Sequence, residues 1–193
     1  MPEKAKQKKI KASKKIIKLD IACGNLKQKD HLGVDISKDT KADFIWDLTK
    51  YPWEFVEDAS VNEIFCAHFV EHIPRMTTYD DGLFHFMDEC YRILKKGGKM
   101  TIICPYYTSH RAWGDATHTR AINEMSFLYF NEEWRNQKFN DVKHYPIHCN
   151  FIMENVNFNI NPQWQGKSQE ALQYALQHNW NVADDIIVTL KKV

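Results

Sequence analysis

The sequence lacks the cysteine spacings and the long apolar runs that mark disulfide-bonded, zinc-binding and membrane proteins. Its five cysteines are far apart and include no C-x-x-C pair, which argues against a disulfide framework and against a cysteine zinc site. No apolar run approaches the roughly 20 residues that would cross a bilayer, and no apolar signal region follows the N-terminal lysines. We therefore expect a soluble, cytoplasmic protein with reduced thiols and no membrane partner.

Phosphate-binding loops are also missing. The chain contains neither G-x-x-x-x-G-K-[ST] nor G-x-G-x-x-G, the patterns that let a bare backbone and a helix N-terminus hold phosphates. The stretch LDIACGN at residues 19–25 offers only Ala22 and Gly24 in their place. A short apolar run that ends in such a loop indicates a ligand without phosphates.

Basic residues are concentrated at the N-terminus. Residues 1–18 hold 8 of the 26 basic residues and one of the 25 acidic residues, so the rest of the chain is mildly acidic. An enzyme that acts on nucleic acid usually carries its basic residues across the folded surface. We expect residues 1–15 to form a disordered, solvated arm, with polyanion contact as the alternative, and residues 16–193 to form a single domain.

Short, partly β-branched apolar runs alternate with polar or helical stretches. The runs cover residues 16–22, 32–36, 42–46, 61–66 and 100–104, and their length and spacing predict the strands of a buried parallel sheet. Ligands of such an open α/β sheet bind at the carboxyl ends of the strands.

Helical spacing between the fourth and fifth runs predicts a helix that Thr77 and Thr78 can cap and that Gly97 and Gly98 end. Farther along, two asparagines can start short helices, residues 151–160 and 185–190 are predicted strands, and residues 168–178 are a predicted helix. The asparagines are Asn123 and Asn131.

Aspartates follow the second and third runs. Asp35 ends HLGVD, where its carboxylate can accept from both hydroxyls of a ribose, and Asp47 with Leu48 ends FIWDL, where a carboxylate and a backbone N–H can meet an adenine edge. Either aspartate could instead cap a loop. Together with the loop at Gly24, they point to adenosine without phosphate.

These segments, in this order, resemble the class I S-adenosylmethionine-dependent methyltransferases, in particular small single-domain proteins of the methyltransferase type 11 kind. The matching stretches are LDIACGN, HLGVDI, ADFIWDLTKYPWEF, VNEIFCAHFVEHI and YRILKKGGKMTIICP, which together extend over residues 16–105. The resemblance implies a doubly wound, mostly parallel, Rossmann-like sheet of seven strands with an antiparallel last strand. It also implies a cofactor-binding half at 16–105 and a substrate-side half at 106–193.

The resemblance further implies which residues bind S-adenosylmethionine. They are Asp20, Ala22 and Gly24 around the methionine part, Asp35 and Ile36 at the ribose, Asp47 and Leu48 at the adenine, and Cys66 and His68 beneath the sulfonium. The chain departs from the family at Ala22, where glycine is common. Only 15 positions separate Asp20 from Asp35, so we expect the first helix to be a turn or absent, with the methionine side open or covered by another segment.

The residues His68, Glu71 and His72 also spell H-x-x-E-H, the pattern of one class of zinc peptidases. That chemistry requires a helix that brings both histidines to one face. Here the motif begins two residues after a predicted strand and meets Pro74 two residues after His72, which leaves little room for a helix. We therefore expect no metal, and we place these residues at the exit of the fourth strand, beside the reactive methyl group.

The loop CPYYTSHRAWGDATHTR after the fifth strand carries the candidate catalytic residues. His110, Asp115 and His118 are candidate bases, and Arg111 and Arg120 could clamp an anionic substrate. The alternative is that Asp115 caps a turn and His118 binds a backbone group.

We expect transfer of a methyl group from S-adenosylmethionine to oxygen or nitrogen of a small-molecule acceptor, which the two arginines would allow to be anionic. The motifs of DNA base methyltransferases are missing at the exit of the fourth strand, where this chain has CAHF. Two alternatives stay open: a catalytically silent partner subunit that binds S-adenosylmethionine, and an RNA methyltransferase that the basic arm tethers to its substrate.

Overall fold

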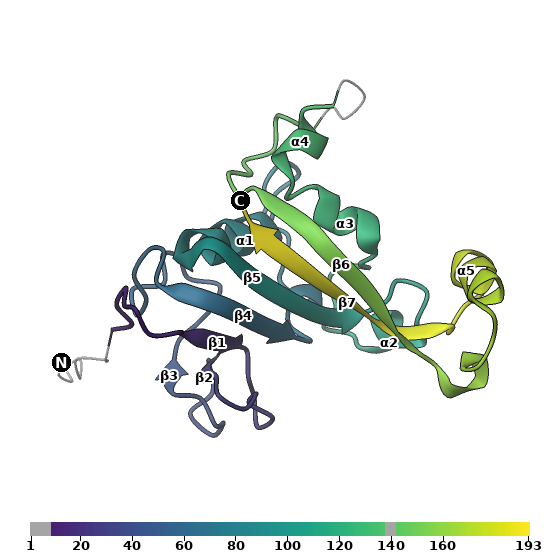
Figure 1. Ribbon diagram of the computed structural model, residues 1–193, viewed down its shortest axis with the longest axis horizontal. Coiled ribbons are helices and arrows are strands. Elements are labelled where there is room, and N and C mark those ends of the chain that lie inside the picture. Colours follow the sequence, from purple (N-terminus) through teal and green to yellow (C-terminus); the bar gives the residue numbers. More distant parts are fainter. Residues whose placement is uncertain (1–8, 138–141) are drawn as a thin grey trace.

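One mixed β-sheet forms the centre of the molecule. The computed structural model describes residues 9–137 and 142–193. Within these ranges seven strands lie in the order β3-β2-β1-β4-β5-β7-β6 (Figure 1). They are β1 Lys18–Ile21, β2 Leu32–Asp35, β3 Phe44–Ile45, β4 Val61–Ala67, β5 Leu94–Pro105, β6 Phe151–Ile160 and β7 Ala183–Lys192. All neighbouring pairs are parallel except the two that β7 makes with β5 and β6. The order and the antiparallel last strand confirm the predicted fold class.

The five apolar runs predicted as strands coincide with β1 to β5, since each run supplies buried residues to the sheet. The strand β5 is longer than predicted because the chain passes from helix α1, Gly82–Ile93, directly into it. Gly97, which was expected to end the helix, lies inside β5 with a positive φ of 76°.

The helix α1 begins later than the sequence predicted. Its N-cap is Asp81, whose carboxylate accepts from the backbone N–H of Leu83 at 2.8 Å, so the prediction of Thr77 and Thr78 as caps is wrong. The hydroxyl of Thr77 instead accepts from the backbone N–H of Asp80 at 2.9 Å. This bond closes a separate turn, and an aspartate that follows the turn starts the helix.

The first residue of α1 has no room for a side chain. A Cβ at Gly82 would lie 2.7 Å from the carbonyl oxygen of Pro74 and 2.8 Å from Cγ2 of Ile73. We expect Gly82→Ala to lower the free energy of unfolding by about 1–3 kcal/mol, because a backbone atom cannot yield as a flexible side chain can. Urea denaturation would measure the change. Gly114→Ala is the matched control, since nothing lies within 4 Å of its Cβ position, and equal losses in both variants would contradict the prediction.

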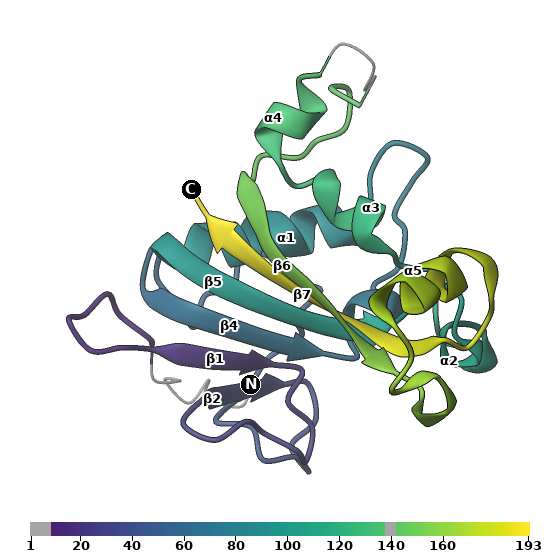
Figure 2. The ribbon, with the colours of Figure 1, turned by 45° about the vertical axis from the view of Figure 1, so that its right-hand side comes forward.

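Helices cover one face of the sheet and leave much of the other face open. In Figures 1 and 2, α1 lies behind β4 and β5, and no helix of the described residues crosses their near face. The burial of β5 agrees with this, because Met100 and Ile102 on one face of the strand are fully buried, whereas Thr101 and Ile103 on the other face are half-buried. Between β1 and β2 the chain forms turns and no helix, as the short spacing predicted.

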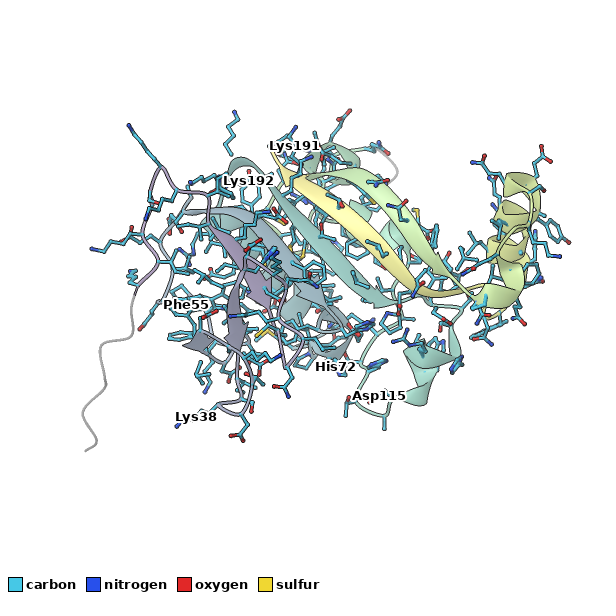
Figure 3. All side chains as sticks on the ribbon, turned by 60° about the horizontal axis from the view of Figure 1, so that its bottom comes forward. Lys38, Phe55, His72, Asp115, Lys191 and Lys192 are labelled. Carbon is cyan, nitrogen blue, oxygen red and sulfur yellow. The ribbon has the colours of Figure 1, made fainter. Side chains whose placement is uncertain are left out.

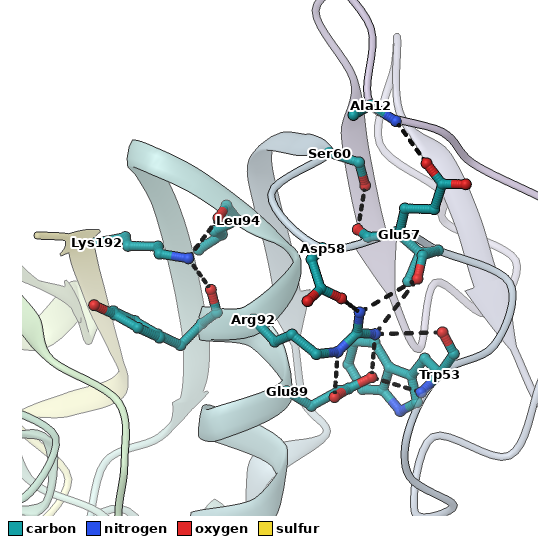
Figure 4. Close-up of polar contacts among 11 residues, drawn as sticks. Ala12, Trp53, Glu57, Asp58, Ser60, Glu89, Arg92, Leu94 and Lys192 are labelled. Carbon is teal, nitrogen blue, oxygen red and sulfur yellow. Dashed lines mark hydrogen bonds and ion pairs between the residues drawn. The ribbon is translucent and has the colours of Figure 1, made fainter.

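A polar cluster around the buried carboxylate of Glu89 joins the segment after β3 to α1 (Figure 4). The carboxylate of Glu89 accepts from the backbone N–H of Trp53 at 2.5 Å and from Nε of Arg92 at 2.9 Å. Arg92 also pairs with Asp58, and its hydrogen bond to Glu89 raises the pKa of the guanidinium. Because Trp53 is fully buried, the cluster fixes the chain that leads from the third strand toward the fourth.

The segment predicted to be a free arm is partly fastened to the body. Ile10 is buried, its backbone N–H donates to the carbonyl of Phe55 at 2.8 Å, and it forms an isolated bridge with Val56. The carbonyl of Ser13 accepts from Nζ of Lys95 at 3.0 Å. Residues 1–8 of the predicted arm lie outside the described residues.

The remaining helices are short, apart from α5. They are η1 Val70–His72, α2 His110–Gly114, α3 Glu124–Leu128, α4 Glu132–Arg135, η2 Pro162–Trp164 and α5 Gln169–His178. Asn123 and Asn131 cap α3 and α4 as predicted, whereas α2, capped by Ser109, was not predicted. Among the described residues, no helix has both the length and the apolar character needed to cross a membrane.

Candidate active site

The glycine loop after β1 is held in a left-handed bend. Ala22 and Gly24 have φ angles of 55° and 49°, values that glycine adopts freely and that strain an alanine. The backbone N–H of Gly24 donates to Oδ2 of Asp35 at 2.9 Å. The end of β2 thus holds the loop that follows β1, and two of the predicted cofactor residues are in direct contact.

The buried side chain of Asp20 holds the far end of the same loop. Its Oδ2 accepts from the backbone N–H of Gln28 at 2.7 Å. Burial raises the pKa of this carboxyl group, although the hydrogen bond from Gln28 opposes the effect. The turns between β1 and β2 are therefore fixed at both ends without a helix.

A cavity of about 370 Å³, the glycine-loop cavity, lies at the carboxyl ends of β1, β4 and β5. Its lining residues are Asp20, Ala22, Cys23, Gly24, Asn25, Leu26, Gln28, Phe65, Ala67, His68 and Ile103. Four of the predicted cofactor residues are among them. Cys66 is not, because its side chain is fully buried in the core, and its neighbours Ala67 and His68 face the cavity in its place.

The predicted ribose and adenine residues lie outside the lining of this cavity. Oδ1 of Asp35 accepts from the backbone N–H of Ser37 at 2.9 Å, and Ile36 is 66% exposed. The carboxylate of Asp47 accepts from the hydroxyl of Thr49 at 2.6 Å, a bond that lowers the pKa of Asp47. Leu48 is buried. Both aspartates thus cap the turns that follow their strands.

A second cavity of about 620 Å³, the histidine cavity, lies at the carboxyl ends of β4 and β5. It is lined by His68, Glu71, His72, Pro105, His110, Arg111, Gly114, Asp115, Ala116 and His118. Figure 3 shows two of these residues, His72 and Asp115, close together on the side of the molecule where α2 lies. All three predicted catalytic residues meet here, and His68 belongs to the lining of both cavities.

The residues of H-x-x-E-H do not form the helix of a zinc peptidase. Only residues 70–72 are helical, as the 3-10 turn η1, and His68 has a positive φ of 54°. Glu71 is 2% exposed, and its nearest charged partner is Nδ1 of His68, 3.4 Å from Oε1. The neighbouring carboxylate of Glu71 raises the pKa of His68.

His118 has the geometry of a base more clearly than Asp115 or His110 does. Its Nδ1 lies 3.2 Å from the carbonyl oxygen of Ala112. Since a carbonyl only accepts, Nδ1 carries the hydrogen and Nε2 is the basic atom. The side chain of His118 is 9% exposed, so the surrounding protein holds the ring in place.

Asp115 and His110 are held by other groups. The carboxylate of Asp115 accepts from the hydroxyl and the backbone N–H of Thr117 at 2.7 and 2.8 Å, and these bonds lower its pKa. Asp115 thus caps a turn and stays ionised near neutral pH. Nδ1 of His110 lies 3.1 Å from Oδ1 of Asn181, and this histidine is exposed.

The prediction that both arginines could clamp an anion is wrong for Arg120. This residue pairs with Asp81 at 2.9 Å and also donates to the carbonyl of Ile73, with a side chain that is 8% exposed. It fastens the loop to the start of α1 and is absent from the histidine cavity. Arg111 does line that cavity, and Asp185 neutralises part of its charge at 2.9 Å.

Sequence reasoning missed the grouping of Glu71, His72 and His118. Each of these residues offers a ligand atom within 4.8 Å of the others. The H-x-x-E-H motif identified two of them, but no local pattern connects them with His118, which lies 46 positions after His72. Thr117 and Asn181, which position His72 and His110, also carried no signal.

Comparison with solved structures places this arrangement in a known fold. A methyltransferase from Archaeoglobus fulgidus that depends on S-adenosylmethionine has a TM-score of 0.61 and 18% identity, over 92% of this chain and 86% of that one. A second S-adenosylmethionine-dependent methyltransferase, from Mesorhizobium loti, has a TM-score of 0.52 and 13% identity, and the match covers 92% of this chain and 91% of that one. A third match is geranyl diphosphate C-methyltransferase from Streptomyces coelicolor, in a complex that includes S-adenosylhomocysteine. It has a TM-score of 0.52 and 12% identity, and the match covers 95% of this chain and 72% of that one.

No protein-family model matches the sequence, and no curated relative matches it either. At these identities the structural likeness shows the fold alone. The chain has the class I methyltransferase fold across most of its length.

Proposed function

We propose that this protein binds S-adenosylmethionine in the glycine-loop cavity and transfers its methyl group to oxygen or nitrogen of a small acceptor in the histidine cavity. The observation that carries the proposal is the position of His68, which lines both cavities. Two ligands that must react have to meet, and here the two cavities adjoin at the exit of β4. The methyltransferase fold that this chain shares with its structural neighbours supports the proposed class of reaction.

The residues of the glycine-loop cavity fit S-adenosylmethionine. A volume of about 370 Å³ lies in the range of small-ligand sites. Nothing lies within 4 Å of the Cβ position of Gly24, so a ligand can approach the bare backbone there. Asp35 lies beside this cavity, where its carboxylate accepts from the backbone N–H of the lining residue Gly24. Each carboxylate oxygen of Asp35 accepts one backbone N–H, which leaves further lone pairs for the two hydroxyls of a ribose that extends past the loop.

S-Adenosylmethionine, when bound, supplies a methyl group on a positively charged sulfur. A lone pair of the acceptor would form the bond to the methyl carbon, while the electron pair of the broken C–S bond returns to sulfur. The protein contributes alignment, exclusion of water and removal of the acceptor's proton. His118 holds a basic Nε2 at the wall of the histidine cavity, because Ala112 fixes the hydrogen on Nδ1.

The histidine cavity favours a small polar acceptor. Its wall carries four histidines, two acidic residues and one arginine, and these groups hydrogen-bond hydroxyls or amines well. Arg120 lies outside this cavity, and Asp185 pairs with Arg111. An anionic acceptor would therefore bind through the N–H groups of Arg111 that Asp185 leaves free.

Calorimetric titration of the purified protein with S-adenosylmethionine and S-adenosylhomocysteine tests the first half of the proposal. We expect micromolar binding of both and no binding of NAD, since the loop has no phosphate-binding glycines. A screen of hydroxylated and amine-bearing metabolites with labelled methyl donor then tests the second half. Lack of binding to either adenosyl compound would overturn the proposed function.

A further inference from the structure

We propose that Glu71, His72 and His118 form a site for one divalent transition-metal ion of the zinc type in the wall of the histidine cavity. Ligand atoms of the three side chains all lie within 4.8 Å of one another. One carboxylate and two imidazoles are the ligand set of mononuclear zinc and iron(II) sites that keep a position open for substrate. The inference replaces the expectation of no metal that the sequence favoured.

The buried carboxylate of Glu71 is the strongest indication of a cation. Its side chain is 3% exposed, and among the described residues neither oxygen has a hydrogen-bond partner. The closest basic atom, Nδ1 of His68, is 3.4 Å from Oε1. A buried carboxylate without hydrogen bonds is costly unless a cation satisfies it, and the cavity beside Glu71 provides room for one.

Both histidines are oriented as metal ligands usually are. Nδ1 of His118 faces the carbonyl of Ala112 at 3.2 Å, and Nδ1 of His72 lies 2.9 Å from the hydroxyl oxygen of Thr117. That hydroxyl donates to Asp115 at 2.7 Å, so its oxygen is free to accept from His72. Each ring thus uses Nδ1 as the donor and keeps the lone pair of Nε2, the arrangement in which a backbone or carboxylate group orients a ligating histidine.

The proposed site differs from that of an H-x-x-E-H peptidase. In such a peptidase both histidines of the motif bind the metal from one helix, whereas here His118, from the loop after α2, takes the place of His68. Oδ2 of Asp115 lies 3.9 Å from Nε2 of His118 on the wall of the same cavity. Three protein ligands leave open positions that face the cavity in which we place the acceptor.

The role of the ion rests on the proposed function. A divalent ion lowers the pKa of an oxygen that binds it, so an acceptor hydroxyl at this site would release its proton to solvent near neutral pH. With Nε2 of His118 bound to the ion, the ion takes the place of His118 in activating the acceptor. The oxygen would then form the bond to the methyl carbon as the C–S bond breaks and its electron pair returns to sulfur. A site of this kind selects acceptors with an oxygen that can reach the metal.

Metal binding can be measured without any methyl acceptor. The full chain is treated with a chelator, dialysed, and titrated with Co²⁺ and with Zn²⁺, using the visible absorption of cobalt and calorimetry as readouts. We expect one ion per chain, and a loss of affinity of about 100-fold or more in Glu71→Gln and in His118→Asn, since even outer-shell changes cost about 10–100-fold. His178→Ala is the matched control, because His178 is exposed at the end of α5, and its affinity should equal that of the parent.

Thermal unfolding of the metal-free proteins separates loss of the site from loss of the fold. Glu71→Gln removes a buried charge whose two oxygens have no hydrogen-bond partner among the described residues, so this variant should unfold at the same temperature as the metal-free parent or higher. Added Zn²⁺ should raise the unfolding temperature of the parent and leave that of Glu71→Gln unchanged. A parent that binds no metal, or a Glu71→Gln variant that binds as tightly as the parent, would overturn the proposal.

The proposed function and the metal site fail in different ways. Titration of the metal-free parent with S-adenosylmethionine reports on the glycine-loop cavity alone. If the adenosyl compound binds and the metal does not, only the metal site is refuted; if the metal binds and the adenosyl compound does not, the metal site stands and the proposed function falls.

Discussion

Replacing His118 with glutamine is expected to lower methyl transfer by about 10³-fold while the affinity for S-adenosylmethionine changes by less than about twofold, because a positioned base contributes about 10²–10⁴-fold to such a step. Glutamine keeps the size of the side chain but cannot take a proton at neutral pH. His118 lines the histidine cavity and not the glycine-loop cavity, so cofactor binding should be spared. Turnover of the acceptor found in the labelled-methyl screen measures the rate of methyl transfer, and calorimetry measures the affinity for S-adenosylmethionine.

Two further variants show how His118 acts, because its Nε2 has one lone pair and can either accept a proton or bind a metal. If His118 is the base, Glu71→Gln should retain most of the activity; if it binds the metal instead, Glu71→Gln should lose about as much as His118→Gln. His110→Gln tests the competing assignment, since His110 lines the same cavity and is held by Asn181. Normal turnover in His118→Gln, with a large loss in His110→Gln, would move the role of the base to His110.

Replacing Asp35 with alanine is expected to weaken binding of S-adenosylmethionine and S-adenosylhomocysteine by about 10²-fold or more. The carboxylate would lose hydrogen bonds to two ribose hydroxyls, each worth about 1.5–3 kcal/mol when the acceptor is charged. The substitution also frees the backbone N–H of Gly24, which Asp35 holds at 2.9 Å. Calorimetric titration at several temperatures would measure the loss.

The control for this prediction is Asp39→Ala, a nearby aspartate that is exposed and should bind the cofactor as the parent does. Circular dichroism and thermal unfolding of Asp35→Ala establish that it is folded, since two backbone N–H groups lose their acceptor. Asp35→Asn should fall between the parent and Asp35→Ala, because its amide oxygen can still accept. Binding by Asp35→Ala within about threefold of the parent would show that Asp35 does not hold the ribose.

Local sequence patterns predicted the sheet well because the central strands are short stretches rich in buried apolar residues. They failed where two neighbouring patterns competed. Thr77 and Asp81 can both cap a helix, and only the structure shows that Thr77 closes the preceding turn while Asp81 starts α1. The helix α2 escaped prediction because its five residues are too few for a helical period to be visible.

The candidate site could be predicted only where its residues follow strands directly. The loop at Gly24 and the carboxylate of Asp35 lie at adjacent strand ends, so parallel pairing of β1 with β2 brings them together. The contact between the H-x-x-E-H segment and His118 depends on how the loop after β5 folds back. The backbone N–H of Thr119 fixes that path by donating to the carbonyl of Glu71 at 2.8 Å. No local residue pattern predicts this bond.

The position of β7 between β5 and β6 determines the order in which the sheet can be completed during synthesis. Among the described strands β6 pairs only with β7, and β7 is made after β6 and α5. A ribosome-bound chain that has released β6 but not β7 therefore exposes one edge of β5 and both edges of β6. Unpaired strand edges attract other chains, so this interval is the stage at which a chaperone would contribute most to the yield of folded protein.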